Sequence, residues 1–236
     1  TNKKSGKPKS PKFNLLLLDS NHSSNKNFSQ VVDSLVMERF YISFFEWVLT
    51  DDDIAIIIKP KKSDNFTNLP KVVEKINSVE KTGRLNIVSS AFQKLPNAYL
   101  KGIDMVVGIS TFLPSAVFEC VSLGKRAVFY DYSNMRYYEA DLYAWGENKV
   151  IFPDIDEMMV ALKSYKADPN SHPALGEWAE RIDELDPYRD GRGRERIGTY
   201  MRWLLESFDK GKRREEAIEN ANKLFAESLG ADKIYK

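Results

Sequence analysis

The stretch from Asp104 to Asp131 constrains the fold of this chain more than any other part of its sequence. Its residues predict a buried strand over 105–109, a small polar turn, a short helix that opens near Pro114, and a second buried strand over 127–130. A strand, a helix and a strand in so few residues form a βαβ unit, whose two strands must run parallel. The sequence therefore predicts an α/β fold with a parallel sheet.

Hydroxyl side chains gather where the first of these strands ends. Ser110 and Thr111 follow the strand, Ser115 lies in the first turn of the expected helix, and Glu119 lies one turn further along. Ligands of open parallel sheets bind outside the carboxyl ends of the strands. Hydroxyls and free amides at a helix N-terminus suit a phosphate, and a carboxylate just behind them suits a sugar diol. The pattern favours a nucleotide-sugar site, with simple helix capping and a solvated Glu119 as the alternative.

The rest of the chain up to residue 165 alternates between apolar strands and amphipathic helices. Nearly continuous apolar runs predict four further strands, over 13–18, 54–58, 85–88 and 149–152. Helical periodicity predicts helices over 30–50, 69–79 and 155–165, the last capped by Asp154, and a short helical turn over 95–100. This alternation predicts a doubly wound α/β domain with a six-stranded, mostly parallel sheet and helices on both faces.

The two ends of the chain differ from this central domain, for which we expect the range 13–184. Residues 1–12 contain five lysines, two prolines and no apolar residue, which predicts a disordered linker. It is either a tag remnant or, as we favour, the link to an upstream domain that is missing here. Residues 185–236 carry two amphipathic helices, which need a surface to cover: the flank of the sheet or a neighbouring domain.

Composition excludes several classes of protein. The formal net charge is +1, so no overall field attracts nucleic acid, and no apolar run approaches the length of a transmembrane helix. The single cysteine, Cys120, falls on the core-facing side of an expected helix, which favours a buried structural thiol in a reducing, cytoplasmic compartment. With two histidines and one cysteine we expect no metal site. Motifs of phosphate-binding P-loops and of nicotinamide-binding enzymes do not occur.

Other candidate binding residues follow the remaining strands. Lys59 ends the second strand and can screen a diphosphate, Ser89 follows the third and can line a base pocket, and Asp131 can bind sugar hydroxyls. His22 lies in the polar loop after the first strand and is a weak catalytic candidate, with an ordinary surface histidine as the alternative. Aromatic residues after the fifth strand either stack on a base or sugar or pack against the rim of the domain; they are Tyr130, Tyr132, Tyr137, Tyr138, Tyr143 and Trp145.

The order of these elements resembles the donor-binding half of GT-B glycosyltransferases. The heptapeptide Glu119-Cys120-Val121-Ser122-Leu123-Gly124-Lys125 is similar to the segment of that family whose glutamate contacts the nucleotide ribose, although Arg126 stands where proline is commonest. The resemblance is strongest to bacterial surface and capsular polysaccharide biosynthesis enzymes. It extends loosely to CDP-glycerol glycerophosphotransferases, through the segments 104–131 and 185–200.

The resemblance implies transfer of a sugar from a nucleotide-sugar donor, which is the substrate, so that no further cofactor is expected. It also implies an N-terminal half that binds the acceptor and often supplies the catalytic base, and peripheral membrane association of the full enzyme. The chain alone is then expected to be inactive. Two alternatives stay open: a non-catalytic nucleotide-binding module, and half of a GT-B-type nucleotide-sugar epimerase.

Overall fold

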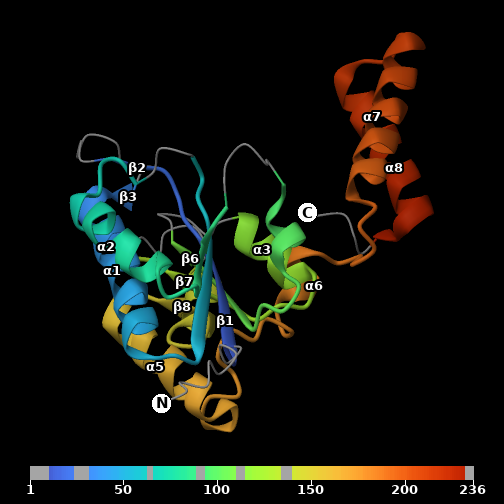
Figure 1. Ribbon diagram of the computed structural model, residues 1–236. Coiled ribbons are helices and arrows are strands. Elements are labelled where there is room, and N and C mark those ends of the chain that lie inside the picture. Colours follow the sequence, from blue (N-terminus) through green and yellow to red (C-terminus); the bar gives the residue numbers. More distant parts are fainter. Residues whose placement is uncertain are drawn as a thin grey trace, which may run out of the picture. The chain divides into compact units, whose positions relative to one another are not determined.

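The computed structural model describes residues 11–23, 32–62, 66–88, 94–109, 115–133 and 140–231. Residue contacts divide the chain into two compact units, Thr1–Glu180 and Arg181–Lys236, each of which is described by itself (Figure 1). The linker expected over 1–12 falls almost entirely outside the described residues.

The first unit is built on a six-stranded sheet in which every pair of neighbouring strands is parallel. Across the sheet the strands are β5 (Leu85–Ile87), β4 (Ile54–Lys59), β1 (Phe13–Leu18), β6 (Met105–Ile109), β7 (Ala127–Tyr130) and β8 (Ile151–Phe152). This confirms the predicted doubly wound α/β fold. Numbered along the chain, the six strands follow the order 3-2-1-4-5-6 of the Rossmann fold, whose direction of winding reverses between β1 and β6.

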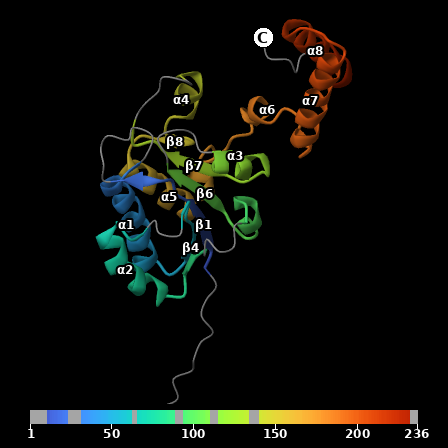
Figure 2. The same ribbon diagram turned by 90° about the horizontal axis from the view of Figure 1, so that it is seen from above.

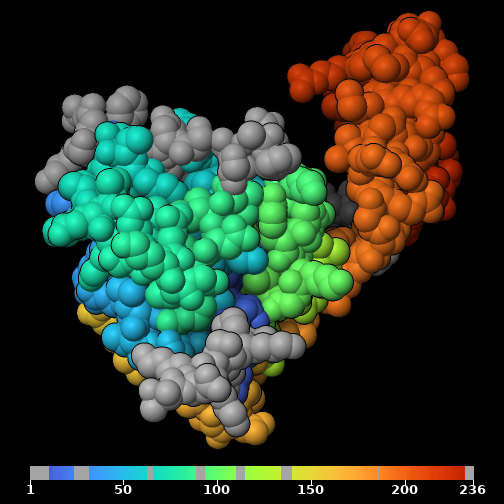
Figure 3. Space-filling model, in the orientation of Figure 1, coloured from blue at the N-terminus to red at the C-terminus, as the bar shows by residue number. Residues whose placement is uncertain are grey.

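One face of the sheet is covered by α1 (Ser34–Thr50), α2 (Pro70–Glu80) and α5 (Ile155–Ala167). Helix α1 supplies most of the aromatic core, because Phe40, Tyr41, Phe44 and Phe45 are all fully buried. Alternate strand residues such as Leu15, Leu17, Ile56, Ile58 and Val107 pack against these helices. In Figure 2, α1 and α2 lie on one side of the strands and α3 on the other. The outer faces of α1 and α2 are visible in blue and teal in Figure 3.

The opposite face is covered by the 3-10 helix η1 (Pro96–Tyr99), by α3 (Ser115–Ser122) and by Trp178, whose ring packs edge-to-face on Phe118 of α3. Trp178 is buried, and its Nε1 donates a 2.8 Å hydrogen bond to the Ala127 carbonyl of β7. Gly176 has a φ of +68°, and a Cβ there would lie 2.7 Å from the sulfur of Met105. Only glycine therefore allows the chain to pass so close to the sheet there.

Four local features differ from the sequence prediction. The helix expected over 30–50 begins at Ser34, because Asp33 caps it by accepting a 2.7 Å bond from the Leu35 amide. A small parallel pair, β2 (His22–Ser23) and β3 (Val32–Asp33), precedes it. Helix α4 (Ala140–Gly146) was not expected, and β8 is shorter than predicted because residues 147–150 form the turn that follows α4.

The second unit consists of α6 (Ile182–Leu185), α7 (Gly193–Asp209) and α8 (Arg214–Leu229). Helices α7 and α8 pack against each other through the buried Ala217 and Ala221 and through an edge-to-face contact of Tyr200 with Phe225. The Tyr200 hydroxyl donates a 2.7 Å hydrogen bond to Asn222. Among the described residues, no helix combines the length and the apolar composition that a membrane span requires.

Candidate functional site

The candidate site is the carboxyl edge of the sheet beside β1 and β6, where the winding reverses. A crevice forms at such a point because the connections that leave the two neighbouring strands turn to opposite faces. Asp19 follows β1 directly, Asp131 follows β7, and α3 starts six residues after the end of β6. Polar groups from strands far apart in the sequence therefore meet at one edge.

Glu119 carries the most informative side chain of this edge. It lies on α3, one turn beyond the exposed Ser115, while Val117, Cys120 and Val121 of the same helix are buried. Its Oε1 atom is buried and accepts no hydrogen bond from any residue that the structure describes. Burial, and after it the charge of Glu119, raises the pKa of the Cys120 thiol to about 12, so that this cysteine stays protonated. That agrees with the structural role expected for it.

The family-like motif after Glu119 returns the chain from α3 to β7. Gly124 adopts a φ of +79°, which ends the helix, and the Lys125 ammonium donates a 2.8 Å bond to the Ile103 carbonyl. Arg126, which stands where the family pattern favours proline, donates to the carbonyls of Pro173 and Leu175 at 2.9 and 2.6 Å. The arginine thus anchors the segment that leads to Trp178.

Asp131 is a second carboxylate with an unused acceptor. Its side chain is only 1% exposed, and its Oδ1 accepts bonds from the amide and the hydroxyl of Ser133 at 3.1 and 2.6 Å. Its Oδ2 is buried and has no hydrogen-bond partner in the described part of the chain, and the same holds for Oδ1 of Asn21 in the loop after β1. Buried polar atoms without partners are rare, because each costs desolvation free energy without a compensating bond.

Asp19 was not singled out by sequence reasoning, yet it organises the loops at this edge. It accepts a 2.6 Å hydrogen bond from the Tyr41 hydroxyl of α1 and another from the Lys61 amide after β4. Burial, and then the nearby Asp19, raises the pKa of Tyr41 well above its usual range, so the hydroxyl remains a donor. The sequence signal was a tyrosine among the buried aromatic residues of α1.

His22, the weak catalytic candidate, also lies at the carboxyl edge. Its Nδ1 is 3.2 Å from the hydroxyl of Ser34, which is 7% exposed at the start of α1. This contact fixes the ring locally, and a catalytic role for His22 stays a prediction. Lys59 is the half-buried last residue of β4, at the same edge.

The remaining predictions have mixed outcomes. Ser89, Ser110 and Thr111 lie outside the described residues, as do Tyr137 and Tyr138. Within the aromatic group, Tyr143 is buried, and Trp145 lies 5.7 Å from Trp178 and bonds Glu180 at 2.5 Å. These two side chains pack against the rim of the domain. The described residues contain no group of three His, Cys, Asp or Glu side chains placed to share a metal ion.

Comparisons with known proteins found similarity only at the level of structure, since no family model and no curated protein matches the chain. The catalytic domain of cholesterol-alpha-glucosyltransferase from Helicobacter pylori is 14% identical with a TM-score of 0.43, covering 75% of this chain and 99% of that one. Two other similar structures are S. aureus MnaA, in a co-structure with UDP, and the Glycosylation Associate Protein (Gap123) complex from Streptococcus agalactiae.

MnaA is 15% identical with a TM-score of 0.49, covering 83% of this chain and 47% of that one. For Gap123 the identity is 13% and the TM-score 0.45, with 78% of this chain and 36% of that one covered. The chain thus spans about half the length of MnaA and about a third of Gap123. Likeness at these identities concerns the fold alone.

Proposed function

We propose that the first unit is the donor-binding half of a glycosyltransferase and holds a nucleotide-sugar at the carboxyl edge of its sheet, beside β1 and β6. The Rossmann strand order supports this proposal, because it creates a ligand crevice at that point. The motif of residues 119–125 supports it through its resemblance to donor-binding segments.

The observation that carries the proposal is the unpartnered Oε1 of Glu119. A buried carboxylate oxygen without a donor is costly in the unliganded chain, and two neighbouring hydroxyls of a ribose supply the missing donors. Helix α3 rises about 1.5 Å per residue, so Glu119 lies roughly 6 Å below Ser115 along the axis. A ribose at Glu119 then leaves the phosphates near the helix start, where free amides favour anions.

The other edge residues receive roles that fit this arrangement. Ser110 and Thr111 join Ser115 around the phosphates, and Lys59 at the end of β4 neutralises part of their charge. The unpartnered Oδ2 of Asp131 accepts a hydrogen bond from a hydroxyl of the donor sugar. Ser89 borders the base.

We further propose that the whole enzyme acts in surface polysaccharide biosynthesis. An N-terminal half then binds the acceptor and supplies the catalytic base, unless His22 takes that role. The chain alone binds the donor without transferring its sugar.

Isothermal titration calorimetry of the chain with UDP, CDP, CMP and GDP tests the proposal. We expect weak binding of at least one nucleotide. Glu119→Gln keeps the shape and one acceptor but loses the charge, so binding should weaken by about 1–3 kcal/mol, the scale of hydrogen bonds to charged groups. Glu119→Ala should weaken binding at least as much.

Two controls sharpen the experiment. Glu74→Gln and Glu74→Ala change an exposed helical glutamate of α2 in the same unit and should leave binding unchanged. A 2′-deoxy nucleotide should bind the wild-type chain more weakly but lose little further with Glu119→Ala, as expected for groups that contact each other. Absence of binding by a folded chain, or full affinity in Glu119→Ala, would contradict the proposal.

A further inference from the structure

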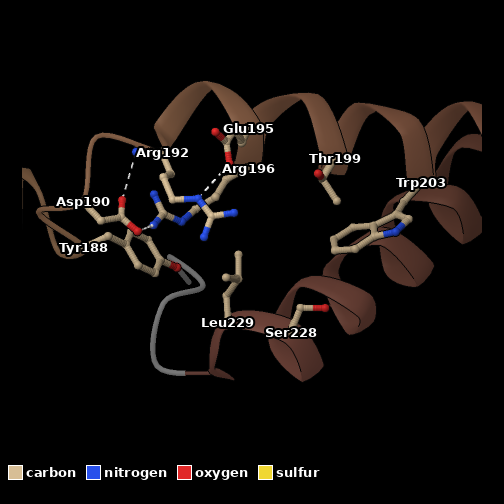
Figure 4. A pocket seen from close by; sticks show the side chains of 9 residues that line it. All are labelled: Tyr188, Asp190, Arg192, Glu195, Arg196, Thr199, Trp203, Ser228 and Leu229. Carbon is tan, nitrogen blue, oxygen red and sulfur yellow. Dashed lines mark hydrogen bonds and ion pairs between the residues drawn. The ribbon is translucent and has the colours of Figure 1, made fainter.

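The second unit contains a pocket lined by its own residues, none of which has a part in the proposed function. It has a volume of about 330 Å³ and lies between the first turns of α7 and the last turn of α8 (Figure 4). Arg192, Arg196 and Thr199 line it from the α7 side, and Leu229 from the end of α8. This volume is at the lower end of what small-molecule sites show.

One wall of the pocket is held rigidly by a stacked arginine. The Arg196 guanidinium lies 3.6 Å from the centre of the Tyr188 ring and forms an ion pair with Asp190. Asp190 also accepts a 3.0 Å bond from the Arg192 amide, and Gly191 provides the tight turn with a φ of +68°. Because Arg196 is engaged on both sides, it shapes the wall and is not the group that meets a ligand.

Hydrogen-bond donors of this pocket remain available. The Nε of Arg192 donates a 2.7 Å bond to Glu195, and the structure records no partner for its two terminal nitrogens among the described residues. The hydroxyl oxygen of Tyr188 is buried, and no described residue bonds to it. Figure 4 shows the hydroxyl-bearing Thr199 and the indole of Trp203 along the rest of the wall. Donors thus lie at one end of the pocket and the flat apolar indole of Trp203 at the other.

We propose that this pocket binds a monocarboxylate with a flat apolar body. The planar fork of the Arg192 guanidinium matches the two oxygens of a carboxylate. The negative charge of Glu195 beside it favours a singly charged ligand over a phosphate dianion. The Trp203 indole, on the side of the pocket away from Tyr188, and Leu229, which lies between the two, then receive the apolar body.

Benzoate is the probe, and the indole N–H signal of Trp203 in a ¹H–¹⁵N NMR spectrum of the full chain is the reporter. The chain has four tryptophans, so Trp203→Phe assigns the signal. Benzoate should shift it in a saturable manner. Benzamide, which has the same shape without the charge, should bind at least about tenfold more weakly, and phenyl phosphate should also bind more weakly than benzoate.

Two arginine variants distinguish specific binding of the carboxylate by Arg192 from a non-specific effect of positive charge. Arg192→Gln should weaken benzoate binding by about tenfold or more and leave benzamide binding unchanged. Arg213→Gln is the matched control, because Arg213 forms the same i,i+3 pair with Glu216 outside the pocket, and it should bind like the wild type. Equal binding of benzoate and benzamide, tighter binding of phenyl phosphate, unchanged benzoate binding in Arg192→Gln, or a Trp203 signal that does not move would overturn the proposal.

Discussion

The two edges of the same sheet differ in how completely their buried polar side chains are hydrogen-bonded by the described residues. At the amino edge, Arg84 donates to the carbonyls of Val48 and Asp51 at 2.6 Å, and Asp104 accepts a 2.7 Å bond from the Asn14 amide. At the carboxyl edge, Glu119 and Asp131 each keep a buried oxygen that no described residue satisfies.

Buried polar groups that bond to one another indicate a structural role, and buried polar groups without partners indicate a place where a ligand can bind. Polar groups that all hydrogen-bond to one another stabilise the fold and need no ligand. An edge that leaves acceptors unsatisfied lowers stability in the free chain, and a bound ligand with hydroxyl or amide donors offsets that cost. Substitutions at the two edges should therefore have opposite consequences for stability and binding.

The largest effect should come from Arg84→Ala at the amino edge. The Arg84 side chain is 13% exposed, and its Nη1 also donates to the Ile54 carbonyl at 3.2 Å. Its loss leaves partly buried carbonyls without donors, so the free energy of unfolding should fall by about 3 kcal/mol. Urea unfolding followed by circular dichroism measures this loss.

Two comparisons test the structural role of Arg84. Arg84→Lys retains the charge but not the planar fork, so its loss should be smaller than that of alanine. Arg213→Ala removes an exposed arginine of the second unit and should change stability very little. If Arg84→Ala were as stable as the wild type, the amino edge would not be the stabilising network described above.

A smaller effect at the amino edge should depend on pH. Partial burial raises the pKa of Asp51, but the bond from Lys166, followed by those from the Asp53 amide and the Trp47 indole, outweighs burial and holds the pKa below its ordinary 3.8. A folded-state pKa below the unfolded one adds stability above the unfolded pKa. That stability, about 1 kcal/mol for a partly exposed pair, is lost as the pH falls below 3.8.

Asp51→Asn should therefore be less stable than the wild type at pH 7 and should converge with it in acid. Urea unfolding at pH 7, 4 and 3 measures the difference, and Glu80→Gln, at an exposed side chain of α2, is the control. If the difference in the free energy of unfolding between the wild type and Asp51→Asn stays constant from pH 7 to 3, the charge of Asp51 does not contribute to stability.

The sequence predicted the central strands β1, β6 and β7 well because they are buried on both faces. The bounds of β1, β6 and β7 match the predicted runs 13–18, 105–109 and 127–130 residue for residue. The order of strands across the sheet could not be read from these runs, because every central parallel strand has the same apolar pattern. Helix α4 was missed for a related reason: its aromatic residues indicated a ligand-stacking loop as readily as a helix.

The site was only partly predictable. Glu119 and Asp131 could be proposed from the sequence because one lies on the helix after β6 and the other directly follows β7, and parallel topology brings the ends of these strands to one edge; their roles stay predictions. Asp19 was missed because its role depends on Tyr41, 22 residues away in sequence, and on the Lys61 amide. No local pattern encodes such a three-part contact. The buried acceptors without partners also required coordinates, because side-chain satisfaction depends on tertiary packing.

The smallest expected effect, and the one of opposite sign, is that of Asp131→Asn at the carboxyl edge. Asparagine keeps the volume and an oxygen for the bonds from Ser133, but it removes a buried charge that is only partly compensated. We expect the free energy of unfolding to rise by up to about 1 kcal/mol at pH 7, because burying an uncompensated carboxylate is costly. Urea unfolding of the ligand-free chain measures this change.

The same substitution should weaken binding of a nucleotide-sugar relative to the matching nucleotide, since Asp131 is proposed to contact the sugar. Asp104→Asn is the matched control at the amino edge: it weakens a charge-assisted bond to Asn14, so it should lower stability slightly and leave binding unchanged. If Asp131→Asn both raises the free energy of unfolding and weakens binding of the nucleotide-sugar, the Asp131 carboxylate lowers the stability of the free chain and is needed for binding the sugar. If Asp131→Asn instead lowered stability as Asp104→Asn does, Asp131 would belong to a self-satisfied network, and the contrast between the two edges would rest on Glu119 alone.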